Sequence, residues 1–256
     1  MGEYMFNIGD YVTRKTYNND IVFKIIGIEG DIYYLKGVCV RLYADSPYDD
    51  LVLYDESDEF DKFQPSIDEY RELNRNEYFY LPGRILHLDG DKEYLDKCMN
   101  FYKKNKIKAY GFFMREADMP LQVMELLKKY NPDILVLTGH DSFSRNKRTK
   151  YKNTSSFINA VMEAREYEKS HEKLFIIAGA CQSNYEELIK AGANFASSPK
   201  RVNIHALDPA IIATSISLTE KNKEVNLIEL LKKTKYGKDG MGGLIVNGLM
   251  YVGYPR

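Results

Sequence analysis

Hydrophobic positions in the first fifty residues alternate with polar ones over short runs. Three of these runs are rich in β-branched and aromatic residues, at 10–14, 21–28 and 32–35. This composition is typical of half-buried strands. Turn-forming residues separate the runs at 18–20 and 29–31, as they do in β-hairpins. The pattern predicts a small antiparallel, SH3-like β-barrel over residues 1–55.

An acidic stretch without a hydrophobic period follows this barrel. Residues 55–61 read DESDEFD, and a charge run of this kind is typical of a solvated segment. We interpret residues 56–77 as an acidic linker. A second domain is therefore expected over residues 78–256.

From residue 78 onward, short apolar runs alternate with segments that have a helical period. The apolar runs lie at 84–88, 107–113, 133–138 and 174–177. The helical segments lie at 92–104, 120–130, 155–167 and 184–191. This alternation indicates βαβ units, and strands apolar on both sides fit a parallel sheet covered by helices on both faces. The predicted fold class is α/β, with a closing strand or hairpin expected over 242–252.

Composition and charge exclude several classes of function. Lys and Arg number 36 and Asp and Glu number 37, for a net charge of -1. This balance argues against a protein that coats nucleic acid or an anionic membrane. No apolar run approaches the roughly 20 residues that cross a bilayer, and the first residues do not have the pattern of a signal peptide. A cytoplasmic location is expected, and no metal or organic cofactor is implied.

The three cysteines, Cys39, Cys98 and Cys181, are widely spaced and odd in number. Without a CxxC pair they indicate neither a zinc site nor a disulfide framework. Cys39 lies in a strand-like run and Cys98 on a predicted helix, so both are interpreted as packing residues. In a reducing cytoplasm a thiol is available for chemistry where its surroundings activate it.

Two loops with reactive side chains follow consecutive predicted strands. His140 comes just after strand 133–138, and Cys181 just after strand 174–177. Because the carboxyl ends of neighbouring parallel strands meet at one sheet edge, the two side chains are expected to lie within reach of each other. An imidazole there can take the thiol proton, and the backbone N–H groups of Cys181 and Asp141 are expected to form an oxyanion hole. The residues thus predict a Cys–His hydrolase.

Other interpretations of these residues stay open at this point. An alternative interpretation of Cys181 is a buried cysteine that only packs in the core. His205 is a rival base, although it follows the cysteine in the chain. Two other functions are a non-enzymatic α/β binding module with an SH3-like reader and an amidotransferase-type hydrolase, in which the cysteine normally precedes the histidine.

The strings around these residues resemble known peptidases. Ala180-Cys181-Gln182 with a histidine upstream resembles the caspase-like cysteine peptidases, which include clostripain, gingipain, separase and the metacaspases. More closely, nearly the whole chain resembles the YabG family of sporulation-specific peptidases. The strings that carry this second resemblance lie at 81–91, 139–141, 179–183, 191–201 and 205–209.

The resemblance implies a cysteine endopeptidase that processes spore coat and cortex-related proteins by cleaving after Arg. Its fold would be a caspase-like parallel sheet between helices. It implies protein substrates as partners, with no nucleic acid and no membrane, and a cytoplasmic setting in the developing spore or the mother cell. The basic loop 144–150, next to His140, is a candidate for self-cleavage.

A preference for Arg requires a buried carboxylate that accepts hydrogen bonds from the guanidinium. Gly179 stands where several Arg-specific relatives carry Asp, so this group must come from elsewhere. Asp89 follows the first strand of the second domain and is the candidate for the pocket. Asp91 is counted among the substrate-binding residues as well and is expected to cap the following helix. Gln182 is a further predicted substrate-binding residue. Asp118 and Asp208 are the alternatives to Asp89 for the pocket.

Overall fold

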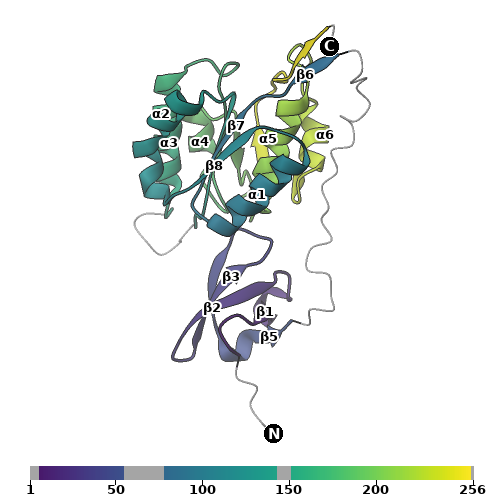
Figure 1. The fold of residues 1–256 in the computed structure, drawn as a ribbon. Helices are drawn as coiled ribbons and strands as arrows, with labels where there is room; N and C mark the ends of the chain where they lie inside the picture. The colour runs from purple at the N-terminus through teal and green to yellow at the C-terminus, as the bar shows by residue number, and fades with distance from the viewer. Residues whose placement is uncertain (1–5, 55–77, 143–150, 255–256) are drawn as a thin grey trace. The chain divides into compact units, whose positions relative to one another are not determined.

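The computed structural model describes residues 6–54, 78–142 and 151–254 (Figure 1). The chain divides into two compact units, Met1–Gln64 and Pro65–Arg256. The boundary between these units falls inside the predicted linker 56–77, which lies outside the described residues. The basic loop 144–150 lies outside them as well.

The first unit contains, in its described part, a five-stranded antiparallel sheet with the order β4-β3-β2-β1-β5. Its strands are β1 (Tyr11–Arg14), β2 (Phe23–Glu29), β3 (Ile32–Gly37), β4 (Tyr43–Pro47) and β5 (Leu51–Leu53), with short 3-10 helices at Lys15–Tyr17 and Tyr48–Asp50. Side chains from alternate positions, such as Phe23, Ile25 and Leu35, form the core of this unit. The predicted strands are therefore present, and the short strands β4 and β5 add to them.

The second unit contains a six-stranded sheet within the described residues, with the order β12-β11-β10-β9-β7-β8. Its strands are β7 (Ile85–Asp89), β8 (Ala109–Phe113), β9 (Ile134–Thr138), β10 (Phe175–Ala178), β11 (Phe195–Ser197) and β12 (Met241–Gly243). All of them run parallel except β12, which pairs antiparallel with β11. The predicted α/β fold class is therefore confirmed.

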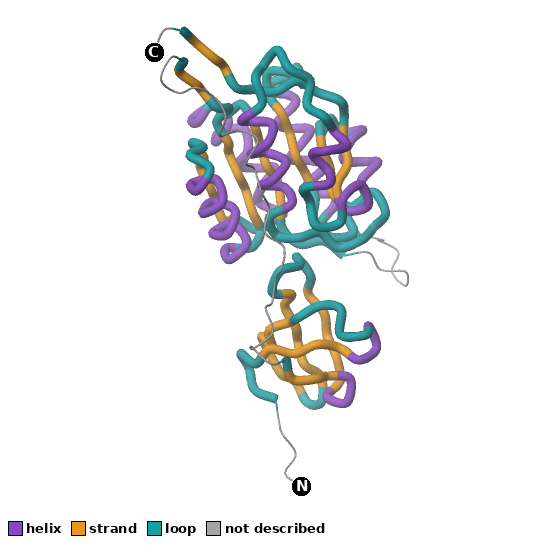
Figure 2. The backbone as a smooth tube through the Cα atoms, turned by 90° about the vertical axis from the view of Figure 1, so that its right-hand side faces the viewer, coloured by secondary structure: helices purple, strands orange, loops and turns teal. Residues whose placement is uncertain are grey.

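Helices cover both faces of this sheet (Figures 1 and 2). They are α1 (Lys92–Lys104), α2 (Met119–Tyr130), α3 (Thr154–Tyr167), α4 (Tyr185–Lys190), α5 (Asp208–Leu218), α6 (Leu227–Lys232) and α7 (Gly237–Gly240), with a 3-10 helix at Glu116–Asp118. Helices α2, α3 and α4 share one hydrophobic core with the sheet, while α1 and α5 pack together on the other face. Among the described residues, no helix is long and apolar enough to span a bilayer.

Helix α5 differs from the other long helices because every one of its residues is buried. A helix surrounded by protein has no polar stripe, so its sequence carries no amphipathic period. This explains why the hydrophobic pattern does not predict α5, although it predicts α1, α2 and α3. Because α5 packs against β9 and β10, it lies under the two strands that lead to His140 and Cys181.

Of the closing strand or hairpin expected over 242–252, the structure contains an edge strand but not the hairpin. Strand β12 pairs with β11, and β13 (Tyr251–Gly253) pairs instead with β6 (Phe79–Leu81) in a separate two-stranded ribbon. Gly243 lies so close to β11 that an added Cβ would meet the Asn194 carbonyl oxygen at 2.5 Å. The glycine run therefore serves close pairing at the sheet edge and does not form a turn.

Arg165, in the last turn of α3, joins three segments that support β10 and β11. Its guanidinium donates to the carbonyl oxygens of Gly192 and Leu174, each at 2.8 Å, and to the side-chain oxygen of Asn194 at 2.7 Å. Burial lowers the pKa of Arg165 to about 10. A half-buried cation with these partners holds the turns before β10 and β11 in place, because it supplies charged donors to their oxygens.

Replacing Arg165 by Ala is expected to lower the free energy of unfolding of the second unit by about 3 kcal/mol, because several buried acceptors lose a charged donor. Urea unfolding followed by circular dichroism measures the loss. The control is Arg115→Ala, which removes an exposed arginine paired with Asp118 and is expected to leave the urea midpoint unchanged. Equal midpoints for both variants would contradict the role given to Arg165.

Candidate active site

Three loops meet at the carboxyl edge of the second sheet. From β7 the chain continues to β8 on one side, and from β9 it continues to β10 on the other side, so the strand order reverses between β7 and β9. The connections that follow β7 and β9 therefore lie on opposite faces of the sheet. In open α/β sheets such a reversal opens the crevice in which ligands bind. The loop after β7 carries Asp91, the loop after β9 carries His140, and the loop after β10 carries Cys181.

His140 is held at its ring and at its backbone. Its Nε2 atom lies 3.0 Å from Oδ2 of Asp91, and its ring packs at 5.7 Å from the ring of Tyr94 on α1. Its backbone N–H donates to Oε1 of Glu116 at 2.8 Å, and its carbonyl oxygen accepts from the Asn153 side chain at 2.7 Å. The imidazole is 14% exposed and thus has a defined direction while still reaching the surface.

Cys181 is fully buried. Its Sγ atom accepts a hydrogen bond from the backbone N–H of Ile204 at 3.2 Å and lies 3.8 Å from the Ile204 carbonyl oxygen. The next residue, Gln182, has a φ of 59°, a left-handed conformation that is costly for a residue with a side chain. Its backbone N–H is fixed by Ser198 Oγ at 2.9 Å. Cys181 therefore lies on a sharply turned loop beneath the segment that contains Ile204.

Gly179 shapes the same loop. It has a φ of 110°, and a Cβ atom added there would meet Oγ of Ser197 at 2.4 Å. A side chain at this position would be strained by its backbone and would collide with its neighbour. An acidic side chain at position 179 is thus excluded by the loop, because the position has room for glycine only.

The side chain of Asp141 connects the histidine loop with the cysteine loop. Its Oδ2 atom accepts hydrogen bonds from Ser183 Oγ at 3.0 Å and from the hydroxyl of Thr154. Its Oδ1 atom accepts from the backbone N–H groups of Asn153 and Ser142 at 2.8 and 2.9 Å. One buried carboxylate thereby joins the loop after β9, the start of α3 and the loop after β10. From the sequence, only the backbone N–H of Asp141 is expected to have a role.

Asp89, the candidate for the specificity pocket, lies inside the fold. Its side chain is fully buried, with Oδ2 accepting from Thr138 Oγ1 and Oδ1 from the N–H of Asp91, both at 2.9 Å. His87 lies 3.5 Å away on the same strand. A substrate guanidinium would have to displace these partners, so the structure does not favour Asp89 as the group that recognises Arg.

The alternatives to Asp89 and the rival base have partners of their own. Asp118 pairs with Arg115 on the surface at 2.9 Å. Asp208 is fully buried and accepts from the backbone N–H groups of His205 and Lys235. His205 accepts at Nδ1 from the N–H of Leu207 at 3.1 Å. It directly follows Ile204, the residue in contact with Cys181, and so stays a structural neighbour of the thiol.

Glu116 is a site residue that sequence reasoning missed. Besides holding the backbone of His140, its carboxylate lies against two glycines: an added Cβ would approach Oε1 to 2.2 Å at Gly90 and to 2.5 Å at Gly139. These glycines open the space that the carboxylate occupies. A glycine directly after each of two adjacent parallel strands was the available signal, because it indicates that another group lies close to the backbone.

Comparison with known proteins identifies the family. The family model described as YabG peptidase U57 matches residues 7–73 and 63–255. The sporulation-specific protease YabG of Bacillus subtilis (strain 168) is 41% identical over 284 residues, covering 98% of this chain and 98% of that protein. The chain belongs to the YabG peptidase family. The predicted resemblance to the YabG family is therefore confirmed, and membership of a peptidase family favours an enzyme over a binding module.

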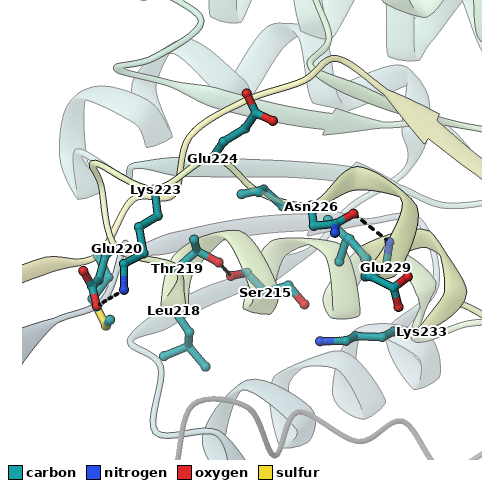
Figure 3. A pocket seen from close by; sticks show the side chains of 12 residues that line it. Ser215, Leu218, Thr219, Glu220, Lys223, Glu224, Asn226, Glu229 and Lys233 are labelled. Atoms are coloured by element: carbon teal, nitrogen blue, oxygen red, sulfur yellow. Dashed lines mark hydrogen bonds and ion pairs between the residues drawn. The ribbon is translucent and has the colours of Figure 1, made fainter.

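A pocket in the described part of this YabG family member lies elsewhere, between the end of α5 and α6 (Figure 3). Its rim carries both acids and lysines, with Lys223 paired to Glu220 at 2.9 Å. Neither His140 nor Cys181 lines it. Among the described residues, no group of three or more His, Cys, Asp or Glu side chains is arranged to hold a metal ion. The loops at the carboxyl edge are the candidate site, because they carry the imidazole of His140 and the thiol of Cys181.

Asp141→Asn is expected to lower the free energy of unfolding by about 2 kcal/mol, because an amide cannot accept from all of the donors that now meet a buried carboxylate. It is also expected to reduce peptidase activity, since the loops of His140 and Cys181 lose their connection. Urea unfolding and a peptide cleavage assay measure the two effects.

The matched control for this variant is Asp133→Asn. Asp133 precedes β9 at the opposite sheet edge and accepts from the backbone N–H and the Nε of Arg84 at 2.7 and 3.1 Å. This change is expected to leave activity unaltered. A fully active Asp141→Asn enzyme would show that the connection between the two loops is not needed for catalysis.

Proposed function

We propose that this protein is a cysteine endopeptidase that acts in sporulation, with Cys181 as the nucleophile and His140 as its base. Membership of the YabG peptidase family and the sporulation-specific protease of Bacillus subtilis support the reaction and its setting. One observation carries the choice of residues. The carboxylate of Asp141 binds Ser183 and so ties the loop of His140 to the loop of Cys181 at one edge of the sheet.

The proposed reaction uses the chemistry of these side chains. His140 takes the thiol proton, and Cys181 Sγ attacks the scissile carbonyl carbon to form a thioester while the amine leaves with a proton from His140. Water then attacks the thioester with the same imidazole as base and releases the new carboxyl terminus. Backbone N–H groups at Cys181 and Asp141 are the proposed donors to the oxyanion.

Access to Cys181 sets a condition on this reaction. Its thiol is fully buried, and the backbone of Ile204 lies against the sulfur. A peptide carbonyl can reach the sulfur only when the segment around Ile204 moves aside. This segment comes between β11 and α5, so its displacement leaves the sheet itself intact. Substrate entry is thus proposed to open the loop between β11 and α5.

Cys181→Ala and His140→Ala are each expected to lower kcat/KM by at least about 1,000-fold, because either change removes one half of the catalytic pair. Hydrolysis of an Arg-containing protein, with the cleaved bonds mapped by mass spectrometry, measures the loss. Cys98→Ala is the matched control, since Cys98 is also fully buried and its Sγ also contacts this segment, at the Ala206 carbonyl oxygen 3.3 Å away. Cys98→Ala is expected to stay active.

Wild-type activity in Cys181→Ala would refute the proposed nucleophile. His205→Gln tests the rival base, which lies next to Ile204 in the chain. A loss in His205→Gln as large as in Cys181→Ala, with His140→Ala still active, would transfer the role of base to His205 and favour the amidotransferase-type arrangement.

We further propose that cleavage follows Arg in spore coat and cortex-related proteins. The support is the resemblance to Arg-specific caspase-like peptidases. Because Gly179 has no room for a side chain and Asp89 is buried with partners, the carboxylate that recognises Arg is proposed to come from a third position. Self-cleavage in the basic loop 144–150 would obey the same preference.

The Arg preference is tested with three peptides that differ only in carrying Arg, citrulline or Lys before the scissile bond. Citrulline keeps the shape of Arg but has no charge, so kcat/KM is expected to fall by about 100-fold if a carboxylate pairs with the guanidinium. The Lys peptide is expected to be cleaved more slowly than the Arg peptide, because an ammonium group cannot form two parallel hydrogen bonds with a carboxylate. Equal rates for all three peptides would rule out an acidic pocket for Arg.

A further inference from the structure

We propose that Asp91 is a positioning residue that orients His140 for catalysis, an inference that rests on the proposed function of the Cys181–His140 pair. Its Oδ2 atom lies 3.0 Å from Nε2 of His140, and its side chain is only 5% exposed. From the sequence, Asp91 is expected to cap the helix and to belong to the substrate-binding residues. The structure adds a direct contact with the catalytic imidazole.

The two oxygens of the Asp91 carboxylate have different partners. Oδ1 caps helix α1 by accepting from the backbone N–H groups of Glu93 and Tyr94 at 2.9 and 3.2 Å. These two bonds fix the plane of the carboxylate, so Oδ2 points at His140 without freedom to turn. A helix cap that is already formed therefore supplies an oriented acceptor.

The backbone of Asp91 is also fixed, through a hydrogen bond to Asp89. Its own backbone N–H donates to Oδ1 of Asp89 at 2.9 Å, and Asp89 accepts from Thr138 on the adjacent strand. This gives Asp89 a purpose different from substrate recognition. It ties the turn after β7 to the end of β9, the strand that leads directly to His140. The distance between Asp91 and His140 is thus set by the sheet itself.

The contact determines which nitrogen of His140 can act as the base. A carboxylate only accepts hydrogen bonds, so Nε2 carries the hydrogen and Nδ1 carries the lone pair in the neutral ring. Nδ1 is therefore the atom that takes the thiol proton. Once the ring is protonated, the negative charge of Asp91 stabilises the imidazolium, as the carboxylate does in Ser–His–Asp enzymes. The ring of Tyr94 packs beside the imidazole and limits its tilt.

The test uses variants that keep the helix cap and lose the charge. Asn and Ser are both good N-cap residues, so Asp91→Asn and Asp91→Ser should keep α1 folded. Each is expected to lower kcat by about 100-fold with KM and the urea midpoint unchanged, because only the imidazolium loses its partner. Kinetics are measured on the full chain with one Arg peptide, beside wild type and His140→Ala.

The matched control is Asn226→Ala. Asn226 caps α6 by accepting from the N–H of Glu229 at 3.2 Å and lies away from the catalytic loops. Its loss is expected to lower the urea midpoint and to leave kcat unaltered. A capping role alone for Asp91 would produce this same pattern in Asp91→Ala and no kcat effect in Asp91→Asn.

The outcomes separate this inference from the proposed function. If Asp91→Asn and Asp91→Ser keep wild-type kcat while Cys181→Ala and His140→Ala are inactive, the inference about Asp91 is overturned and the proposed function stands. If Cys181→Ala stays active, the proposed nucleophile fails. Comparison of Asp91→Asn with His140→Ala then still decides whether Asp91 acts through the histidine.

Discussion

The buried carboxylate of Asp141 accepts hydrogen bonds from three parts of the chain, and the arrangement of the candidate site depends on it. A buried charge is stable only when its oxygens are satisfied. Here the partners come from the loop after β9, the first turn of α3 and the loop after β10. None of these loops can shift alone without leaving the charge unsatisfied. The carboxylate therefore makes the spacing of His140 and Cys181 a property of the folded core.

A second layer of carboxylates acts in the same way on the other side of His140. Asp89 lies within the sheet, Asp91 lies at the start of α1, and Glu116 lies beside the backbone of His140. Each accepts hydrogen bonds from backbone N–H groups or from the imidazole. Hydrogen bonds to a charged acceptor are stronger than neutral ones, so these acids give the histidine loop a rigidity that its length alone would not provide.

The sequence predicts the parts of this site that follow from strand topology. His140 and Cys181 come at the ends of apolar runs, and parallel pairing brings such ends to one edge. The cap role of Asp91 follows from its place before an amphipathic segment. Its contact with His140, and the burial of Asp89, depend on how the turn after β7 meets the end of β9, which no local pattern encodes. Helix α5 escaped prediction because complete burial removes its period.

The position of Cys181 beneath Ile204 also bears on the chemical durability of the thiol. Oxidation of cysteine to sulfenic and higher acids requires contact between the sulfur and a dissolved oxidant, and it follows solvent exposure and thiolate character. A sulfur with no exposed surface is out of reach of peroxide while the segment stays closed. If the segment opens for substrate as proposed, the sulfur meets dissolved oxidants only during the interval in which a substrate can also reach it.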